Sequence, residues 1–278
     1  MTKRNISALD VLNFEGKEKI STYSKKIDDL LDGGIPVGYL TEIFGNPGSG
    51  KSNLCLQLAI AAQMSHSMKA GETGGAIYID TEGSFIPIRL YDIAVAAHSH
   101  YKMSRDTSAQ VDHRKLLENV TYFRCLNITN LISCIMQLKA LFLSEKKIKL
   151  IVVDSLAHPL RTVEGDNSLR TKYTTMVVSI LQKLATDYKC AVIVTNHTAT
   201  KVDSSHGEKY TTPTLGEMWG HLPLIRLKLS WKNNCRDAIL IKSPHQPEGS
   251  VPFQITAGGI RDVDTVTNGN DCPDVDSN

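Results

Sequence analysis

The sequence predicts an α/β fold in which a mostly parallel, twisted β-sheet is flanked by helices and ends in an antiparallel extension. Short apolar segments alternate with longer segments of helical periodicity through the middle of the chain, which is the pattern of parallel strands joined by crossover helices. A glycine-rich segment joins the first of these strands to the first helix. Short strand-like segments separated by turn residues follow the last helix, as in antiparallel sheets.

The expected elements follow one another in a regular order. The chain begins with a polar lead-in, 1–34, in which Ile27 and Leu30 lie at helical spacing. The strands of the parallel part are expected at 40–44, 76–80, 120–125, 150–154 and 190–195. The helices between them are expected from Leu54 onward and at 86–97, 130–143 and 168–188. The extension is expected at 224–231, 238–242 and 251–255.

These elements predict one domain, because a chain of 278 residues suits a single large α/β unit better than two equal units. We place this domain at 35–262 and treat 1–34 as a linker. The acidic segment 263–278 is low in apolar residues and is expected to be disordered.

Composition narrows the function classes without naming a partner. The net charge of +2 is too small to create a global positive field, so any nucleic-acid binding must come from local loops. No apolar run approaches the length that spans a membrane, and we expect a soluble protein without a membrane partner. The six cysteines include no C-x-x-C pair, so neither a zinc site nor a secreted disulfide framework is indicated.

A complete phosphate-binding motif, G-N-P-G-S-G-K-S, lies between the first strand and the first helix. Glycines allow backbone N–H groups to turn toward phosphates at the start of a helix, which favours negative charge. Lys51 would reach the β- and γ-phosphates, and the Ser52 hydroxyl would bind Mg²⁺. The alternative is an ordinary glycine-rich turn, which the flanking strand and helix disfavour. The motif consists of Gly45, Asn46, Pro47, Gly48, Ser49, Gly50, Lys51 and Ser52.

Two carboxylates end apolar strands of the expected parallel sheet. Asp154 ends L-I-V-V-D, where an acid would lie beside Mg²⁺ at the carboxyl edge of the sheet. Glu82, in I-D-T-E-G, would activate the attacking water as a general base. The alternatives are a capping or turn aspartate for Asp154 and a surface turn for Glu82.

Several motifs together resemble the RecA-like recombinases of eukaryotes and archaea, and most closely the C-type paralogues of the strand-exchange recombinase. The resemblance extends from about Ser7 to Asp262. The motifs are, in chain order, G-G-I-P-V-G, the phosphate-binding loop, I-D-T-E-G-S-F, Y-F-R-C, L-I-V-V-D-S, S-L-R-T-K, V-T-N-H and L-G-E-M-W-G-H. The resemblance implies a RecA-like P-loop ATPase core that binds ATP and Mg²⁺.

The resemblance also assigns roles to individual residues. It makes Glu82 the catalytic carboxylate and Asp154 the Walker B acid, and it places Arg89 against the adenine. From residue type alone, Arg89 is an exposed helix residue. Asn196 and His197 stand where the family carries a polar sensor of the γ-phosphate, and His197 replaces a glutamine found in many recombinases. An imidazole can still form hydrogen bonds, but its response can depend on pH.

The resemblance further implies two DNA-binding loops, 158–170 and 198–215. Their cations could neutralise phosphates of single-stranded DNA, although acids in both loops leave an ordinary solvated loop as an equal alternative. The candidate DNA-binding residues are Arg161, Arg170, Lys201 and Lys209. Lys242 stands where related filaments act on the nucleotide of a neighbouring subunit, and we treat it as a catalytic candidate that supplies positive charge in trans. The alternative for Lys242 is an exposed lysine at a strand end.

The function implied by the resemblance is a DNA-dependent ATPase that acts as a recombinase mediator in homologous recombination and double-strand break repair. Its expected partners are single-stranded DNA, other recombinase paralogues in a hetero-oligomer, and the recombinase itself. The family's small N-terminal helical domain has no counterpart in 1–34, and nuclear localisation is implied by the family alone. The alternative is a nucleotide-gated scaffold with negligible hydrolysis.

Overall fold

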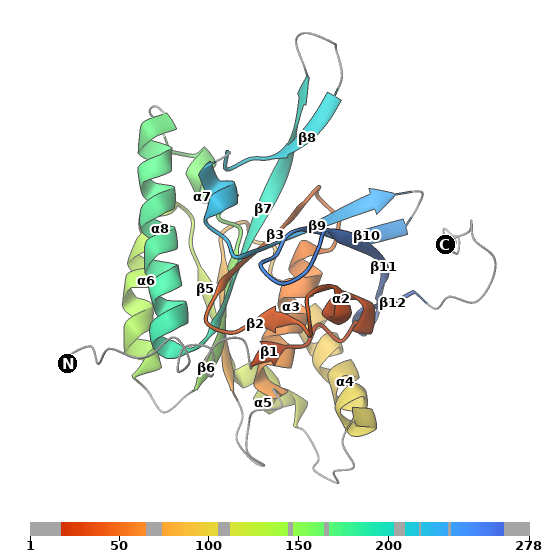
Figure 1. Cartoon of the computed structure of the whole chain (residues 1–278). Coiled ribbons are helices and arrows are strands. Elements are labelled where there is room, and N and C mark those ends of the chain that lie inside the picture. The colour runs from red at the N-terminus through yellow and green to blue at the C-terminus, as the bar shows by residue number, and fades with distance from the viewer. Residues whose placement is uncertain are drawn as a thin grey trace, which may run out of the picture.

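The computed structural model describes residues 18–64, 74–104, 112–143, 147–163, 167–202, 209–216, 218–232 and 235–263. These residues form one large sheet with helices on both faces (Figure 1). The strands of this sheet are β3 (Leu40–Gly45), β4 (Gly75–Asp80), β5 (Val120–Arg124), β6 (Ile148–Asp154), β7 (Ala191–Val202), β8 (Lys209–Pro213), β9 (Ile225–Lys232), β10 (Cys235–Lys242), β11 (Gly249–Thr256) and β12 (Gly259–Asp262).

The helices connect the strands in the predicted alternation. The helical elements are α2 (Lys25–Leu30), α3 (Lys51–Ala61), η1 (Ala62–Met64), α4 (Pro87–Ser104), α5 (His113–Glu118), α6 (Ile128–Phe142), α7 (Ala157–Arg161), α8 (Asn167–Tyr188) and η2 (Met218–His221). Within the described residues, no helix is both long enough and apolar enough to cross a bilayer.

The sheet confirms the predicted fold class. Its strand order is β12-β11-β10-β9-β3-β7-β6-β4-β5, with β8 paired to β7. The strands from β9 to β5 pair in parallel, and those from β9 to β12 pair in antiparallel fashion. The antiparallel extension therefore begins one strand later than predicted, because β9 runs parallel to β3. The carboxyl ends of β3, β4, β6 and β7 consequently lie at one edge of the sheet.

Two hydrophobic cores cover the two faces of the sheet. Helices α3, α4 and α5 cover one face, and α6, α7 and α8 cover the other (Figure 1). Strand residues alternate between the two cores: Tyr78 and Val152 belong to the first, whereas Ile77 and Val153 belong to the second. This alternation holds the central strands rigidly between two packed layers, so their carboxyl ends are fixed supports for side chains.

The described part of the lead-in, from residue 18 onward, packs on the same core as the rest of the chain. The short strand β1 (Lys19–Ile20) pairs with β2 (Ile35–Pro36), and Ile20 and Ile27 are buried in the first core. Asp262 at the end of β12 accepts hydrogen bonds from the first amides of α2. Residues 1–17 of the predicted linker and the predicted tail from 264 lie outside the described residues.

The second predicted DNA-binding loop is largely a β-hairpin. Strand β7 continues from the sheet to Val202 and pairs with β8 in the register Thr198 to Pro213 and Val202 to Lys209. This hairpin projects from the body of the molecule (Figure 1). The prediction of a strand ending at 195 was therefore too short.

Candidate functional site

The phosphate-binding motif has the strand, loop and helix arrangement that its sequence requires. Strand β3 ends at Gly45, and helix α3 begins at Lys51. Gly48 and Gly50 have φ angles of 77° and 107°, which glycine adopts without steric cost. A Cβ on Gly45 would lie 2.0 Å from the carbonyl oxygen of Leu229, so only glycine fits there. The loop can therefore turn its amides toward an anion at the start of α3.

Lys51 is folded back onto the loop that it follows. Its side chain is buried, and its Nζ donates to the carbonyl oxygens of Gly45 at 2.9 Å and Asn46 at 3.0 Å. Burial lowers the pKa of Lys51, whereas the negative charges of Asp154 and Glu82 oppose this shift. The buried Ser49 hydroxyl has no hydrogen-bond partner among the described residues. A cationic Nζ and an unpaired hydroxyl in one loop fit a phosphate group.

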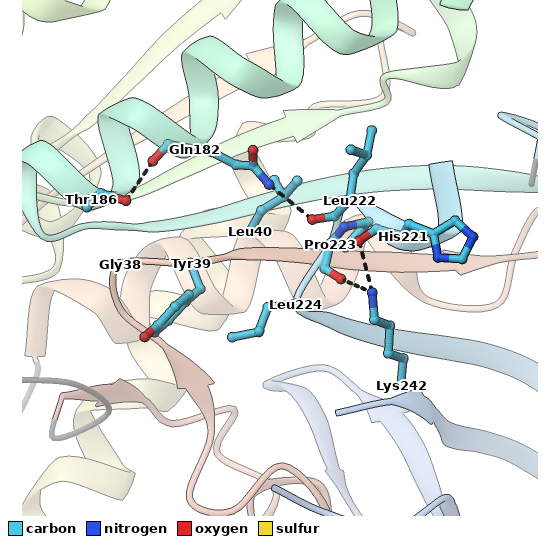
Figure 2. Close-up of a pocket in the computed structure, with 10 residues that line it drawn as sticks. All are labelled: Gly38, Tyr39, Leu40, Gln182, Thr186, His221, Leu222, Pro223, Leu224 and Lys242. Carbon is cyan, nitrogen blue, oxygen red and sulfur yellow. Dashed lines mark hydrogen bonds between the residues drawn. The ribbon is translucent and has the colours of Figure 1, made fainter. Parts of the chain in front are cut away.

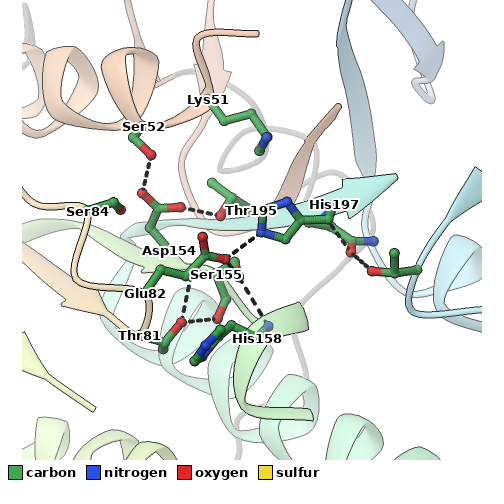
Figure 3. Close-up of polar contacts among 12 residues, drawn as sticks. Lys51, Ser52, Thr81, Glu82, Ser84, Asp154, Ser155, His158, Thr195 and His197 are labelled. Carbon is green, nitrogen blue, oxygen red and sulfur yellow. Dashed lines mark hydrogen bonds and ion pairs between the residues drawn. The ribbon is translucent and has the colours of Figure 1, made fainter. Parts of the chain in front are cut away.

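Asp154 lies at the centre of a cluster of hydroxyl groups (Figure 3). Its Oδ2 accepts hydrogen bonds from the Ser52 hydroxyl and from the Tyr78 hydroxyl, each at 2.7 Å. Its Oδ1 accepts from the Thr195 hydroxyl at 2.5 Å. Burial and the Asp154 carboxylate raise the pKa of Tyr78, which keeps this phenol protonated. Ser52 and Asp154 are thus held together as oxygen ligands of the kind that Mg²⁺ prefers.

Glu82 follows β4 in a turn that Asp80 holds. The Asp80 carboxylate accepts from the backbone amides of Glu82 at 3.0 Å and Gly83 at 2.7 Å. The Glu82 carboxylate accepts from the Ser155 hydroxyl and lies 2.5 Å from Nε2 of His197 (Figure 3). Burial alone would raise the pKa of Glu82, but the hydrogen bonds from His197 and Ser155 outweigh it and lower this pKa to about 2. Glu82 is therefore ionised at physiological pH and engaged by an imidazole.

A second histidine lies beside the same carboxylate. His158 lies on α7, three residues after Ser155, and its backbone amide donates to the Ser155 hydroxyl at 3.2 Å. Its Nδ1 is buried and has no hydrogen-bond partner among the described residues. The nearby His158 also contributes to the lowered pKa of Glu82. Two imidazoles thus lie near the predicted catalytic base.

The structure places Arg89 next to the helix that follows the phosphate-binding loop. Its Nε donates to the Asn53 side chain at 2.8 Å, and its Nη2 donates to the carbonyl oxygen of Thr256 at 2.6 Å. Its Nη1 donates to the carbonyl oxygen of Ala257. Arg89 therefore connects Asn53, the α3 residue that follows Ser52, to the end of β11 and the turn after it.

Asn196 and Lys242 make their side-chain hydrogen bonds with groups other than Asp154 and Glu82. The Asn196 side chain donates to the buried Glu42 at 2.8 Å. Lys242 lies at the edge of a pocket of about 380 Å³ near the start of β3 (Figure 2). Its Nζ donates to the carbonyl oxygens of Gly220, His221 and Pro223 at 2.8–3.2 Å. Burial and nearby Arg226 lower the pKa of Lys242.

The four candidate DNA-binding residues lie on two separate elements. Arg161 is exposed at the end of α7, and Arg170 on α8 is exposed and donates to the carbonyl oxygen of Val163. For Lys201 and Lys209 only the backbone is described, and it lies in the β7–β8 hairpin. The structure brings these residues to the carboxyl side of the sheet, the side on which the phosphate-binding loop also lies.

Comparison with known proteins identifies the family. The family model described as Rad51 matches residues 17–263. The chain belongs to the Rad51 family. This Rad51-family chain is 37% identical over 270 residues to "DNA repair protein RAD51 homolog 3" of Cricetulus griseus, across 94% of the chain and 73% of that protein. It is 36% identical over 271 residues to the protein of the same name from Dictyostelium discoideum, across 95% of the chain and 71% of that protein.

The predicted resemblance to RecA-like recombinases and their C-type paralogues is thus confirmed. For this Rad51-family chain, the structure brings together five of the predicted site residues, Lys51, Ser52, Glu82, Asp154 and His197 (Figure 3). Three residues that hold the two carboxylates were not predicted from the sequence: Tyr78, Ser155 and Thr195. The available signal was a polar side chain within or directly after an apolar strand.

Proposed function

We propose that the chain is an ATP-binding, DNA-dependent ATPase that acts as a recombinase mediator in homologous recombination and double-strand break repair. The observation that carries this proposal is the convergence of a phosphate-binding lysine, a hydroxyl and carboxylate pair and a second carboxylate at one edge of the sheet. The Rad51 family and the two named DNA repair relatives support the biological role.

The residues have complementary parts in the proposed hydrolysis of ATP. Lys51 leaves the loop carbonyls and donates to the β- and γ-phosphates, which its buried ammonium attracts strongly. Ser52 and Asp154 would hold Mg²⁺, and the ion would supply positive charge to the phosphates. Glu82 orients the attacking water and accepts its proton once the His197 imidazole moves to the γ-phosphate. Arg89 contacts the adenine. Asn196 supports His197, because its side-chain oxygen accepts a hydrogen bond from the His197 backbone amide.

Single-stranded DNA is the proposed activator and related paralogues are the proposed partners. Arg161 and Arg170, with Lys201 and Lys209 of the hairpin, supply cations to the phosphates of one strand. Strand β7 carries His197 and continues into the β7–β8 hairpin, so the proposed DNA contact and the nucleotide site share one strand. The partners include other paralogues in a hetero-oligomer and the recombinase, and the site of action is the nucleus.

A nucleotide-gated scaffold with negligible hydrolysis is the second candidate. The observation that favours it is the contact of Glu82 with His197 at 2.5 Å, which lowers the pKa of Glu82 to about 2. A carboxylate with so low a pKa is a weak general base, because base strength falls with the pKa. ATP would then bind through Lys51 and Asp154 without rapid turnover.

Steady-state ATP hydrolysis with and without single-stranded DNA tests the proposal. The matched variants are Lys51→Ala, which removes phosphate binding, and Glu82→Gln, which keeps the shape of the site but removes the base. Hydrolysis that rises with DNA and disappears in both variants supports the ATPase. Tight ATP binding without hydrolysis supports the scaffold, and absence of ATP binding contradicts both.

We further propose that Lys242 supplies positive charge to the nucleotide of an adjacent subunit. In this chain its ammonium is held by carbonyl oxygens of 220–223, so it would exchange these acceptors for a phosphate on assembly. The Lys242→Ala variant is expected to lower ATP turnover of the assembled complex at least tenfold, as loss of a catalytic cation does. Unchanged turnover in the complex would exclude this role.

A further inference from the structure

Strand β3 carries a buried carboxylate that the proposed hydrolysis does not use. Glu42 is fully buried in the middle of L-T-E-I-F, three residues before Gly45. Its Oε2 accepts from Nε of Arg226 at 2.6 Å. Its Oε1 accepts from the Asn196 amide at 2.8 Å and from the Trp219 indole N–H at 2.5 Å. A buried charge requires such partners, and here they come from three different elements, β9, β7 and η2.

On the nucleotide side, the Glu42 cluster is joined to the residue that contacts the predicted catalytic base. The Asn196 side-chain oxygen accepts from the backbone amide of His197 at 2.8 Å. The His197 ring in turn contacts Glu82. Any displacement of His197 toward a γ-phosphate therefore also acts on the Asn196 side chain that donates to Glu42.

On the opposite side, the cluster fixes the part of the chain that returns from the β7–β8 hairpin, residues 214–216 and 218–221, here called the return segment. The Thr214 hydroxyl donates to the Asn196 side-chain oxygen at 2.8 Å, and the Thr214 amide donates to the carbonyl oxygen of His197 at 3.0 Å. Trp219, near the end of this segment, is buried and donates to Glu42. The return segment is thus held at Thr214 by the Asn196 side chain and at Trp219 by the Glu42 side chain.

Arg226, the third donor to Glu42, connects the cluster to β3, the strand that leads into the phosphate-binding loop. The guanidinium of Arg226 lies 5.1 Å from the centre of the Phe44 ring, directly before Gly45. The Nε of Arg226 donates a hydrogen bond to Glu42. Because the Glu42 carboxylate is fully buried, water cannot readily replace one of its donors. A shift of one donor therefore forces the others to rearrange.

We propose that Glu42 is a positioning residue that couples nucleotide bound at the phosphate loop to the position of the return segment. The inference rests on the proposed binding of ATP and adds the route by which that binding reaches the base of the hairpin. When His197 turns toward the nucleotide, Asn196 moves with it and Glu42 transmits the change to the Trp219 indole. Glu42 itself touches neither nucleotide nor metal.

Trp219 provides a direct reporter, because the chain has only one other tryptophan, Trp231. Trp231 is about half exposed and stacks with Arg236, so Trp231→Phe keeps an aromatic ring there and leaves Trp219 as the single emitter. The experiment adds a non-hydrolysable ATP analogue with Mg²⁺ to this variant and records the Trp219 emission maximum. Calorimetry measures nucleotide binding independently in the same samples. We expect a shift of the emission maximum that saturates with binding.

Two further substitutions in the Trp231→Phe background test the route. Glu42→Gln keeps the size of the side chain but removes its charge, and it is expected to abolish the nucleotide-dependent shift while binding persists. Thr214→Val, at a partly exposed position, is expected to reduce the shift without affecting the core. Glu18→Gln, which alters a partly buried ion pair with Lys149, is the matched control and is expected to leave the shift unchanged.

The outcomes separate this inference from the proposed function. A full shift in the Glu42→Gln variant, or nucleotide binding without any Trp219 shift in the parent variant, overturns the coupling and leaves ATP binding intact. If calorimetry detects no nucleotide binding, the proposed function fails and the inference fails with it. A purely structural role for Glu42 would change emission without nucleotide, but it would not remove the nucleotide-dependent difference in a folded variant.

Discussion

Replacing Tyr78 by phenylalanine removes one of the three hydroxyl groups that hold Asp154. The Tyr78 hydroxyl lies 2.7 Å from Asp154 Oδ2, and both side chains are buried. A hydrogen bond to a charged group contributes about 1.5–3 kcal/mol to stability. Because the donors from Ser52 and Thr195 remain, we expect the lower part of this range, about 1.5–2 kcal/mol. In a chain of this size, such a loss lowers Tm by about 3–8 °C.

The same substitution is expected to weaken metal binding, because Tyr78 orients the carboxylate proposed to hold Mg²⁺. Loss of such an outer contact typically reduces metal affinity about 10–100-fold, and with two donors left we expect about tenfold. Titration of Mg²⁺ at fixed ATP, followed by calorimetry, measures this change, and circular dichroism on heating measures Tm.

A matched control makes the same chemical change at an exposed site. Tyr122 donates to the Asp80 carboxylate at 3.2 Å, and 43% of this residue is exposed. We expect Tyr122→Phe to change stability by no more than about 0.5 kcal/mol and to leave Mg²⁺ affinity unchanged. If Tyr78→Phe behaves like Tyr122→Phe in both assays, the assigned role of the buried hydroxyl is refuted.

Two further predictions follow from the geometry of the site. Gly45→Ala should prevent folding, because its Cβ would lie 2.0 Å from the Leu229 carbonyl oxygen. The Cβ of Gly48→Ala meets no atom within 4 Å, so this variant should lose only about 1–2 kcal/mol of stability through its left-handed backbone. Soluble yield and Tm distinguish the two variants. His197→Ala should raise the pKa of Glu82 from about 2 toward its ordinary 4.5. The folded state then loses the stabilisation that ionised Glu82 provides above pH 4.5 and that the parent protein loses toward pH 2. An NMR titration midpoint of Glu82 that stays near 2 in the variant contradicts this prediction.

The parallel part of the fold could be predicted from the sequence because burial on both faces leaves a continuous apolar pattern. The strand predicted at 150–154 is β6 (Ile148–Asp154), and the strand predicted at 76–80 is β4 (Gly75–Asp80). The extension of β7 to Val202 was missed for the converse reason. Residues 196–202 read N-H-T-A-T-K-V, which lacks the continuous apolar pattern on which the prediction depends. The hairpin that they enter projects from the body of the molecule (Figure 1).

The site divides in the same way into residues that a motif reveals and residues that only the fold reveals. Lys51 and Ser52 belong to a local motif whose spacing is fixed by the loop. Tyr78 and Thr195 reach Asp154 from neighbouring strands, and strand order does not follow from the sequence of either strand. Glu42 did carry a signal, since a carboxylate within an apolar strand is costly unless partners are present. Its partners, however, come from distant elements.

The two carboxylates at the sheet edge are held by different chemistry, and this difference bears on the choice between ATPase and scaffold. Asp154 is held by hydroxyl groups, whose hydrogen bonds do not change between pH 5 and 8, so metal binding should be constant across that range. Glu82 is held by His197, which lies on the strand that continues into the β7–β8 hairpin. If the chain acts as the proposed ATPase, nucleotide binding and hydrolysis would be controlled separately in this site. DNA bound at the hairpin that releases His197 should then increase turnover without changing the affinity for ATP and Mg²⁺, whereas a scaffold should show no such dependence.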